Sequence, residues 1–435
     1  MPVWTRLPLA TVLGVILWAL PWSAPGLPFA DDSACLAEGR SHGGSGDSGQ
    51  GEGSAVALAF VRGSSSFAPG GSGDQEAAGW RLDVVWSVGG VDVPEEEAFG
   101  AVYGLSIGPH GQVFVLDRQA HSITVFDPEG RFLRRFGGRG EGPGEFRGPS
   151  AMTWDACGRL WVIDAFNHRY TAFDSTGRVL ETLRRPFTTV HGRYQHLLVL
   201  EDSSLLDESG WPVRGHYSIA FVRIDRSGAP VDSFPPLPIR PDTGLPGPTR
   251  PEEDAASWMR LNTVLGELIP YRPHLRYALT GDTTVWFARS DRYQLVHRTL
   301  GGDTLLVLEP GHRSPTLDRE DAQFIRGVLS SNRFRPTDFG FEFGRQIIQA
   351  LVPLEDGRIL VQIVQRPGRD SALFDLYDGT GSFLGEVRFP VPVDTRAPPA
   401  VDGDTIVFVS RGEFDEIYVH KGVLRRVGGA SPGDS

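Results

Sequence analysis

The sequence predicts an all-β protein, most of which forms a six-bladed β-propeller, and three observations lead to this fold class. The 54 glycines and 33 prolines make up about a fifth of the 435 residues, which favours turns and short strands over helices. Two segments superimpose when the chain is shifted by 47 residues, the separation of Gly111 and Gly158. Weaker copies follow, and four short strands in 40–50 residues are typical of one propeller blade.

The first 30 residues predict an export signal or an N-terminal anchor. Arg6 precedes an apolar run from Leu7 to Leu20. A secretory signal needs about 7–15 apolar residues, whereas a membrane span needs about 20. We therefore expect the protein to be exported to the periplasm or the extracellular space. Contact with a membrane is expected only through an uncleaved anchor.

Residues 31–79 predict a disordered linker, because they are rich in glycine and serine and bury too little apolar surface to offset the entropy of ordering. Within them, Val56–Val61 is apolar but is too short and isolated to count as an element. The propeller is predicted to span residues 80–428, and residues 429–435 to form a disordered tail.

The two clearest blades lie between Val102 and Arg185. Each copy has a glycine turn, an alternating apolar strand, a short turn with a histidine, a second strand ending in Phe-Asp, and a further glycine turn. The aligned features are Gly111–Asp117 with Gly158–Asp164, His121 with His168, and Phe126–Arg131 with Phe173–Arg178.

These two copies resemble NHL repeats. The resemblance is carried by Val-Leu-Asp at 115–117 with Ile-Thr-Val-Phe-Asp-Pro-Glu-Gly-Arg at 123–131, and by the corresponding residues 162–178. The linker Gly140–Pro149 is similar to the one that joins successive NHL blades. The resemblance covers residues 100–185 and extends to bacterial exported six-bladed propeller proteins, most of which have no assigned reaction. It implies a six-bladed fold.

Degenerate copies complete the count of six blades, with seven as the alternative. Trp80–Val88 alternates and precedes the first full copy, so we expect it to be the outer strand that completes the last blade and closes the ring. The degenerate copies are His196–Glu201 with Phe221–Gly228, Gly281–Phe287 with Asp291–His297, Asp356–Val361 with Leu376–Gly381, and Gly403–Phe408 with Glu416–His420.

Two insertions interrupt the pattern. Pro235–Pro273 is rich in proline and has a helical patch at Glu252–Leu268. Ser314–Gln349 contains a predicted helix from Thr316, its N-cap, to Leu329. Long loops on a compact scaffold are commonly functional, so these partly helical insertions are candidates for a lid over one face.

Composition and motifs exclude several functions. A formal net charge of -12 argues against nucleic-acid binding, which needs a basic face. The sequence has no H-E-x-x-H, P-loop, G-x-S-x-G or C-x-x-C motif, so it lacks the signatures of common hydrolases and zinc peptidases. Two cysteines are too few for a disulfide framework. We expect a monomer, and a binding function rather than an enzyme.

The repeated aspartates and histidines predict structural roles. Asp127 and Asp174 recur in equivalent turns, as do His121 and His168. A catalytic group is needed once, whereas a turn needs its hydrogen bonds in every blade. These residues are therefore expected to hold turns.

Arginines near the starts of the inner strands are the main candidates for a binding site. Inner strands line the channel of a propeller, so guanidinium groups at their entry could ring its mouth and bind a carboxylate, a phosphate or an acidic sugar. The alternative is that these side chains pair with nearby acids. The candidates are Arg147, Arg193, Arg272, Arg276, Arg345 and Arg396.

A metal site in the channel is the second candidate. Histidines that lead into neighbouring inner strands could together hold zinc, which accepts three histidines plus a water. Calcium is the alternative cofactor. The candidates are His191, His196 and His274.

The sequence therefore predicts an exported, non-catalytic binding module without a cofactor. Its ligand is expected to be a small anion or a protein segment, bound at the channel entries of blades three to six or by the insertions. The alternative is a metal-dependent lyase or lactone hydrolase with its site in the same channel.

Overall fold

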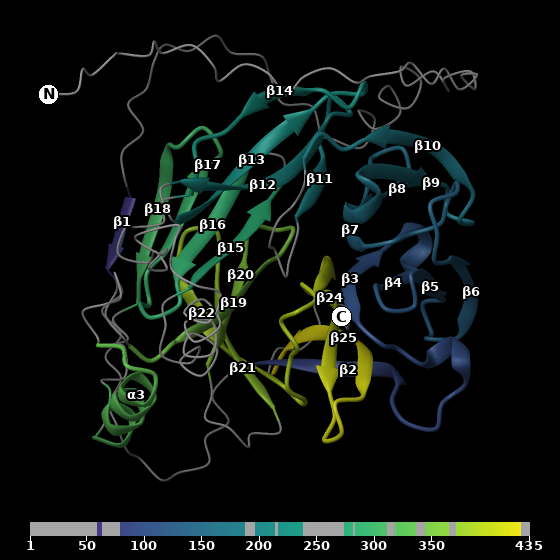
Figure 1. Ribbon diagram of the computed structural model, residues 1–435. Helices are drawn as coiled ribbons and strands as arrows, with labels where there is room; N and C mark the ends of the chain where they lie inside the picture. Colours follow the sequence, from purple (N-terminus) through teal and green to yellow (C-terminus); the bar gives the residue numbers. More distant parts are fainter. Residues whose placement is uncertain are drawn as a thin grey trace, which may run out of the picture. The chain divides into compact units, whose positions relative to one another are not determined.

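The computed structural model describes most of the predicted propeller (Figure 1). The described residues are 59–62, 79–187, 196–213, 216–237, 274–281, 283–310, 317, 319–335, 344–364 and 371–427. The predicted signal, most of the linker, the tail, the helical patch at 252–268 and the N-cap Thr316 lie outside them.

The described strands form six antiparallel units of four strands, each of which is one blade. The first blade consists of β3(Val102–Ile107), β4(Val113–Asp117), β5(Ser122–Phe126) and β6(Phe132–Gly137). The second consists of β7(Pro149–Trp154), β8(Leu160–Asp164), β9(Arg169–Phe173) and β10(Val179–Arg184). The third and fourth are β11(Leu197–Val199), β12(Leu205–Val213), β13(His216–Ile224) and β14(Pro230–Ser233), then β15(Leu275–Thr280), β16(Thr284–Arg289), β17(Leu295–Thr299) and β18(Thr304–Glu309). The last two are β19(Ile348–Pro353), β20(Ile359–Ile363), β21(Ala372–Tyr377) and β22(Phe383–Phe389), then β23(Ala400–Asp402), β24(Thr405–Arg411), β25(Ile417–Arg426) and β2(Trp80–Gly89).

The N-terminal strand β2 closes the propeller. It pairs antiparallel with β25 along its length, so a strand from before the first blade becomes the outer strand of the sixth, as the sequence predicts. Trp80 and Arg81 also pair in parallel with Val387 and Arg388 of β22. This short pairing joins the fifth and sixth blades into one eight-stranded sheet, so the six blades form five hydrogen-bonded sheets.

Each blade presents an apolar face to both of its neighbours. In β4, Val113 and Val115 pack against the sixth blade, whereas Phe114 and Leu116 pack against the second, because alternate side chains point to opposite faces of a strand. Six buried clusters fill the six interfaces in turn, and one of them lies between the sixth blade and the first. The core is therefore a closed ring of interfaces.

The repeated aspartates hold turns. The Asp127 carboxylate accepts backbone N–H groups of Glu129 and Arg131 at 3.0 and 2.8 Å, and Asp174 accepts equivalent bonds in the second blade. His121 and His168 have φ of 55° and 49°, a left-handed conformation that turns require. The geometry of the turns therefore explains why these aspartates and histidines recur in both blades.

A short strand within the predicted linker departs from the expectation. β1(Ala59–Arg62) pairs in parallel with the outer strand β18, from Leu306 to Glu309. The sequence prediction that this stretch forms no element is wrong for these residues. The reason is that an outer strand leaves a row of backbone N–H and C=O groups that can pair with any extended segment.

The second insertion contains the predicted helix. α3(Arg319–Ser331) buries Ile325, Val328 and Leu329. Arg345, beyond the helix, forms a two-point ion pair with Asp321 at 2.6 and 2.7 Å. The pair ties the helix to the chain that enters β19. Within the described part of the chain, no helix is long and apolar enough to cross a membrane.

Two buried polar groups strengthen particular blades. At the interface of the second and third blades, Asp207 accepts bonds from Arg185 and from the Tyr170 hydroxyl at 2.6 and 2.7 Å, and both charged side chains are fully buried. In the sixth blade, the His420 ring is hydrogen-bonded to Ser87 and Ser410, each at 2.7 Å. Burial lowers the pKa of His420 to about 4.

Asp207→Asn is expected to destabilise the protein by about 3–5 kcal/mol, because Arg185 would keep its buried charge without a carboxylate. The control Asp174→Asn changes an exposed turn in the second blade and should cost about 1 kcal/mol or less. Urea unfolding measures both. Equal losses would contradict a special role for the buried pair.

His420 predicts a loss of stability in mild acid. Its pKa is about 4 when folded and about 6.5 when exposed, so the unfolded chain takes up the proton first as the pH falls. The His420 contribution is complete above pH 6.5 and falls by about 3 kcal/mol by pH 4. In His420→Asn that component should disappear from the pH profile of unfolding, whereas the exposed control His110→Asn should retain it. A profile unchanged by His420→Asn would refute the assignment.

Candidate functional site: the central cavity

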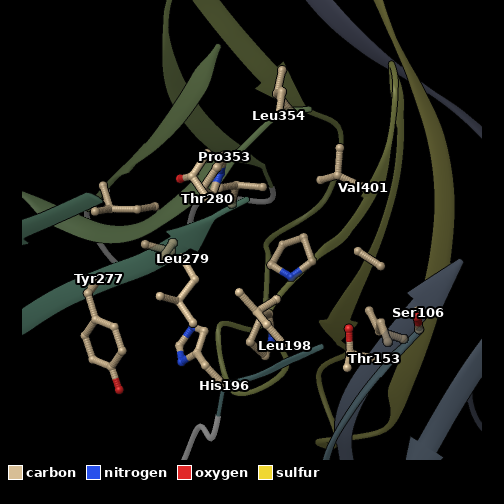
Figure 2. A pocket seen from close by; sticks show the side chains of 18 of the residues that line it. Ser106, Thr153, His196, Leu198, Tyr277, Leu279, Thr280, Pro353, Leu354 and Val401 are labelled. Carbon is tan, nitrogen blue, oxygen red and sulfur yellow. The ribbon is translucent and has the colours of Figure 1, made fainter. Parts of the chain in front are cut away.

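A cavity of about 680 Å³ lies where the innermost strands of the blades converge. All six blades contribute to its wall, and Figure 2 shows side chains from several of them directed into the space. The lining segments are Leu105–Ile107, Met152–Trp154, His196–Leu198, Leu275–Gly281, Gln349–Glu355, Thr395 and Pro398–Val401.

Residues at the same height along the channel, one from each blade, form one level of the wall. One such level has hydroxyls on one side and apolar side chains on the other. Strand register places one residue of each blade at this level, opposite the residue of the second strand that packs against the following blade. The six residues are Ser106, Thr153, Leu198, Ala278, Val352 and Ala400. The first and second blades therefore carry the hydroxyls, and the other four blades carry aliphatic side chains.

Two aromatic rings lie in the wall on the third and fourth blades. His196, directly before β11, and Tyr277 of β15 have ring centroids 4.9 Å apart. Both residues line the cavity (Figure 2).

Glu208 links the two rings. It lies on β12 beside β11, is largely buried, and its Oε2 is 3.4 Å from Nδ1 of His196. The Glu208 carboxylate also lies close enough to the Tyr277 hydroxyl to influence it electrostatically. Burial of the ring, followed by the nearby carboxylate, raises the pKa of Tyr277 well above its usual value, so the hydroxyl keeps its proton. Glu208 was not among the residues predicted from the sequence, although it follows Asp207, which pairs with Leu197 directly after His196.

The cavity has a cationic end and an acidic end. Arg276 enters the wall at the start of β15, and its Nη2 donates to the neutral Oε1 of Gln346 at 3.1 Å. Glu355, in the turn after β19, is exposed at the opposite end of the inner strands and accepts the Gly403 N–H at 3.1 Å. The two charges give the cavity an electrostatic direction.

The other candidate arginines lie elsewhere. Three of them pair with acids, as the alternative interpretation expected: Arg147 with Glu141 at 2.7 Å, Arg345 with Asp321 at 2.6 Å, and Arg396 with Asp394 at 2.9 Å. Of the arginines that the structure describes, Arg276 alone lines the cavity. Arg193 and Arg272 lie outside the described residues. The described arginines are thus not gathered into a ring.

The candidate histidines are also separated. His196 lines the cavity, whereas His274, whose backbone N–H donates to Ser290 Oγ at 2.8 Å, is not part of the wall. His191 lies outside the described residues. Over the described ranges, no three His, Cys, Asp or Glu side chains are grouped so that they could hold a metal ion.

Comparison with known proteins supports the architecture. Residues 95–205 match a family described as a 6-bladed beta-propeller. The matched residues include the first two blades, whose sequence resembles NHL repeats. The description of the family gives a six-bladed propeller and does not mention NHL repeats. This chain is a β-propeller. No curated protein matches its sequence.

Solved structures show only distant likeness. A DUF4221-family protein from Bacteroides vulgatus is 10% identical over 80% of this chain and 99% of its own, with a TM-score of 0.48. A Bacteroides fragilis protein, whose name provisionally describes it as exported, is 14% identical over 81% and 98%, with a TM-score of 0.47. Virginiamycin B lyase from Staphylococcus aureus is 14% identical over 81% and 97%, with a TM-score of 0.37. At these values no activity is transferred to this chain.

Proposed function

We propose that this protein is a non-catalytic binding module that holds a small anionic ligand in its central cavity, with the anionic group at Arg276. The observation that carries the proposal is a cavity of about 680 Å³ with a guanidinium in an otherwise largely apolar wall. Sites for small molecules commonly have about 300–1,000 Å³ and a few polar groups among apolar ones. A guanidinium matches carboxylate and phosphate oxygens with two parallel bonds.

The charges at the two ends orient the ligand. Arg276 attracts an anion to the end where the inner strands begin, and Glu355 repels it from the other end. Both interactions are stronger beside low-dielectric walls than in open water. His196 presents an imidazole near the same end as Arg276 and is held by Glu208. In this proposal the His196–Glu208–Tyr277 group shapes the wall and performs no chemistry.

The proposal includes export and monomeric action. Export is supported by the apolar run Leu7–Leu20 after Arg6, whose length suits a secretory signal. An NHL relationship is supported by the sequence of the first two blades. A ring with all six interfaces filled supplies its own core, so folding does not require a partner subunit.

Octanoate is expected to raise the melting temperature of the protein, and Arg276→Gln to abolish that rise. At a concentration one hundred times the Kd, the gain in stability should be about 2.7 kcal/mol. The control Arg147→Gln removes a guanidinium that bonds Glu141 outside the cavity, and should behave as wild type. Thermal melts and calorimetric titration measure the effect. A rise that persists in Arg276→Gln would contradict the proposed site.

The second candidate function is a metal-dependent lyase or lactone hydrolase, favoured by the presence of His196 in the cavity wall. The binding proposal predicts that a chelator leaves the melting temperature unchanged. Metal analysis of the purified protein and a melt with EDTA test this. Stoichiometric zinc or calcium, together with a melting temperature lowered by EDTA, would favour the enzyme and contradict the binding module.

A further inference from the structure

We infer that the ligand is amphipathic along its length: an acid with an apolar body that also bears a hydroxyl, or an equivalent hydrogen-bonding group, far from the acid group. This rests on the proposed function and specifies the ligand class of the same cavity. The feature that carries it is the level of the wall where Ser106 and Thr153 face four aliphatic side chains.

Ser106 and Thr153 form a polar strip on one side of the cavity. They lie at the same register on neighbouring inner strands, β3 and β7, which are in contact, and Figure 2 shows them on one side of the space. Over the described residues, neither hydroxyl forms a hydrogen bond to the protein, and both side chains are partly exposed. They are therefore open to the cavity, where a ligand or solvent can bond them.

The opposite side of this level offers no hydrogen bond from a side chain. Ala278 and Val352, on the fourth and fifth blades, line it with aliphatic groups. A polar substituent of the ligand directed at this side would lose its hydration and gain no hydrogen bond. A substituent directed at Ser106 and Thr153 avoids this cost. The wall therefore distinguishes a ligand with a polar group on one edge from one that is polar all round.

Strand geometry sets a lower limit on the separation of the two polar groups of the ligand. Arg276 lies two residues before Ala278, which is at the level of the hydroxyls. At about 3.3 Å per residue the two levels are about 7 Å apart along the strand. Ser106 and Thr153 also lie on the first and second blades, across the cavity from the fourth, so the two polar groups are further apart than this. An extended chain of about eight atoms with bonds of about 1.5 Å covers about 9 Å. A hydroxyl at the far end of an eight-carbon acid reaches the strip, whereas one near the carboxylate does not.

The test compares octanoate, 8-hydroxyoctanoate and 3-hydroxyoctanoate by calorimetric titration. Wild type should bind 8-hydroxyoctanoate about three- to tenfold more tightly than octanoate, which is the gain of one additional hydrogen bond. It should show no such preference for 3-hydroxyoctanoate. The double variant Ser106→Ala/Thr153→Val should lose the preference and keep its affinity for octanoate.

Thr395→Val provides the matched control, because Thr395 lines the cavity from the chain that precedes β23 and is not at the level of the strip. This variant should keep the wild-type preference. If the double variant fails to fold, Ser106→Ala and Thr153→Ala are measured singly, and each should reduce the preference.

The outcomes separate this inference from the proposed function. Equal binding of octanoate and 8-hydroxyoctanoate by wild type, or a preference that survives in the double variant, overturns the inference while Arg276-dependent binding of octanoate still supports the proposed function. Absence of binding by all three acids, or binding that Arg276→Gln does not weaken, overturns both.

Discussion

The structure depends on one constraint, which is that every blade has two apolar faces and both must be covered. A four-stranded antiparallel sheet with buried side chains on each side cannot be stable alone in water, because both faces would expose hydrocarbon. β4 illustrates this, since Val113 and Val115 face one neighbour and Phe114 and Leu116 face the other. Six such blades satisfy one another only if the last packs against the first. The N-terminal strand β2 completes the sixth blade and makes this last contact possible.

The cavity is a consequence of the same constraint. When six blades close, their innermost strands converge, and the side chains at each register level form one level of the wall. Function then depends on which side chains differ between blades. His196, Tyr277 and Arg276 lie on the third and fourth blades, which are among the degenerate copies of the repeat. Ser106 and Thr153 lie on the two most regular blades, so regularity in the outer strands does not exclude a role for the inner strand in binding.

Much of the fold could be predicted from sequence. Blade repeats follow from strand alternation and glycine turns, which are local, and the closing role of Trp80–Gly89 follows from the need of the last blade for an outer strand. The strand β1 could not be predicted, because its pairing with β18 uses backbone groups and not a side-chain pattern.

The site was only partly predictable. Arg276 and His196 were named because they lie near the starts of inner strands. The sequence could not show that Arg345 pairs with Asp321 or Arg147 with Glu141, since these contacts depend on how the loops fold back. The hydroxyl strip was missed because Ser106 and Thr153 become neighbours only when two blades are aligned at the same register. Such levels can be found from sequence once the hairpins are placed.

The most direct measurement is a crystal structure of the protein soaked with 8-bromooctanoate, with anomalous scattering used to locate the bromine. The account predicts bromine inside the central cavity at the level of Ser106 and Thr153, with the carboxylate bonded to Arg276. Bromine at the Arg276 end with the carboxylate towards Glu355, or bromine only outside the cavity, would contradict it.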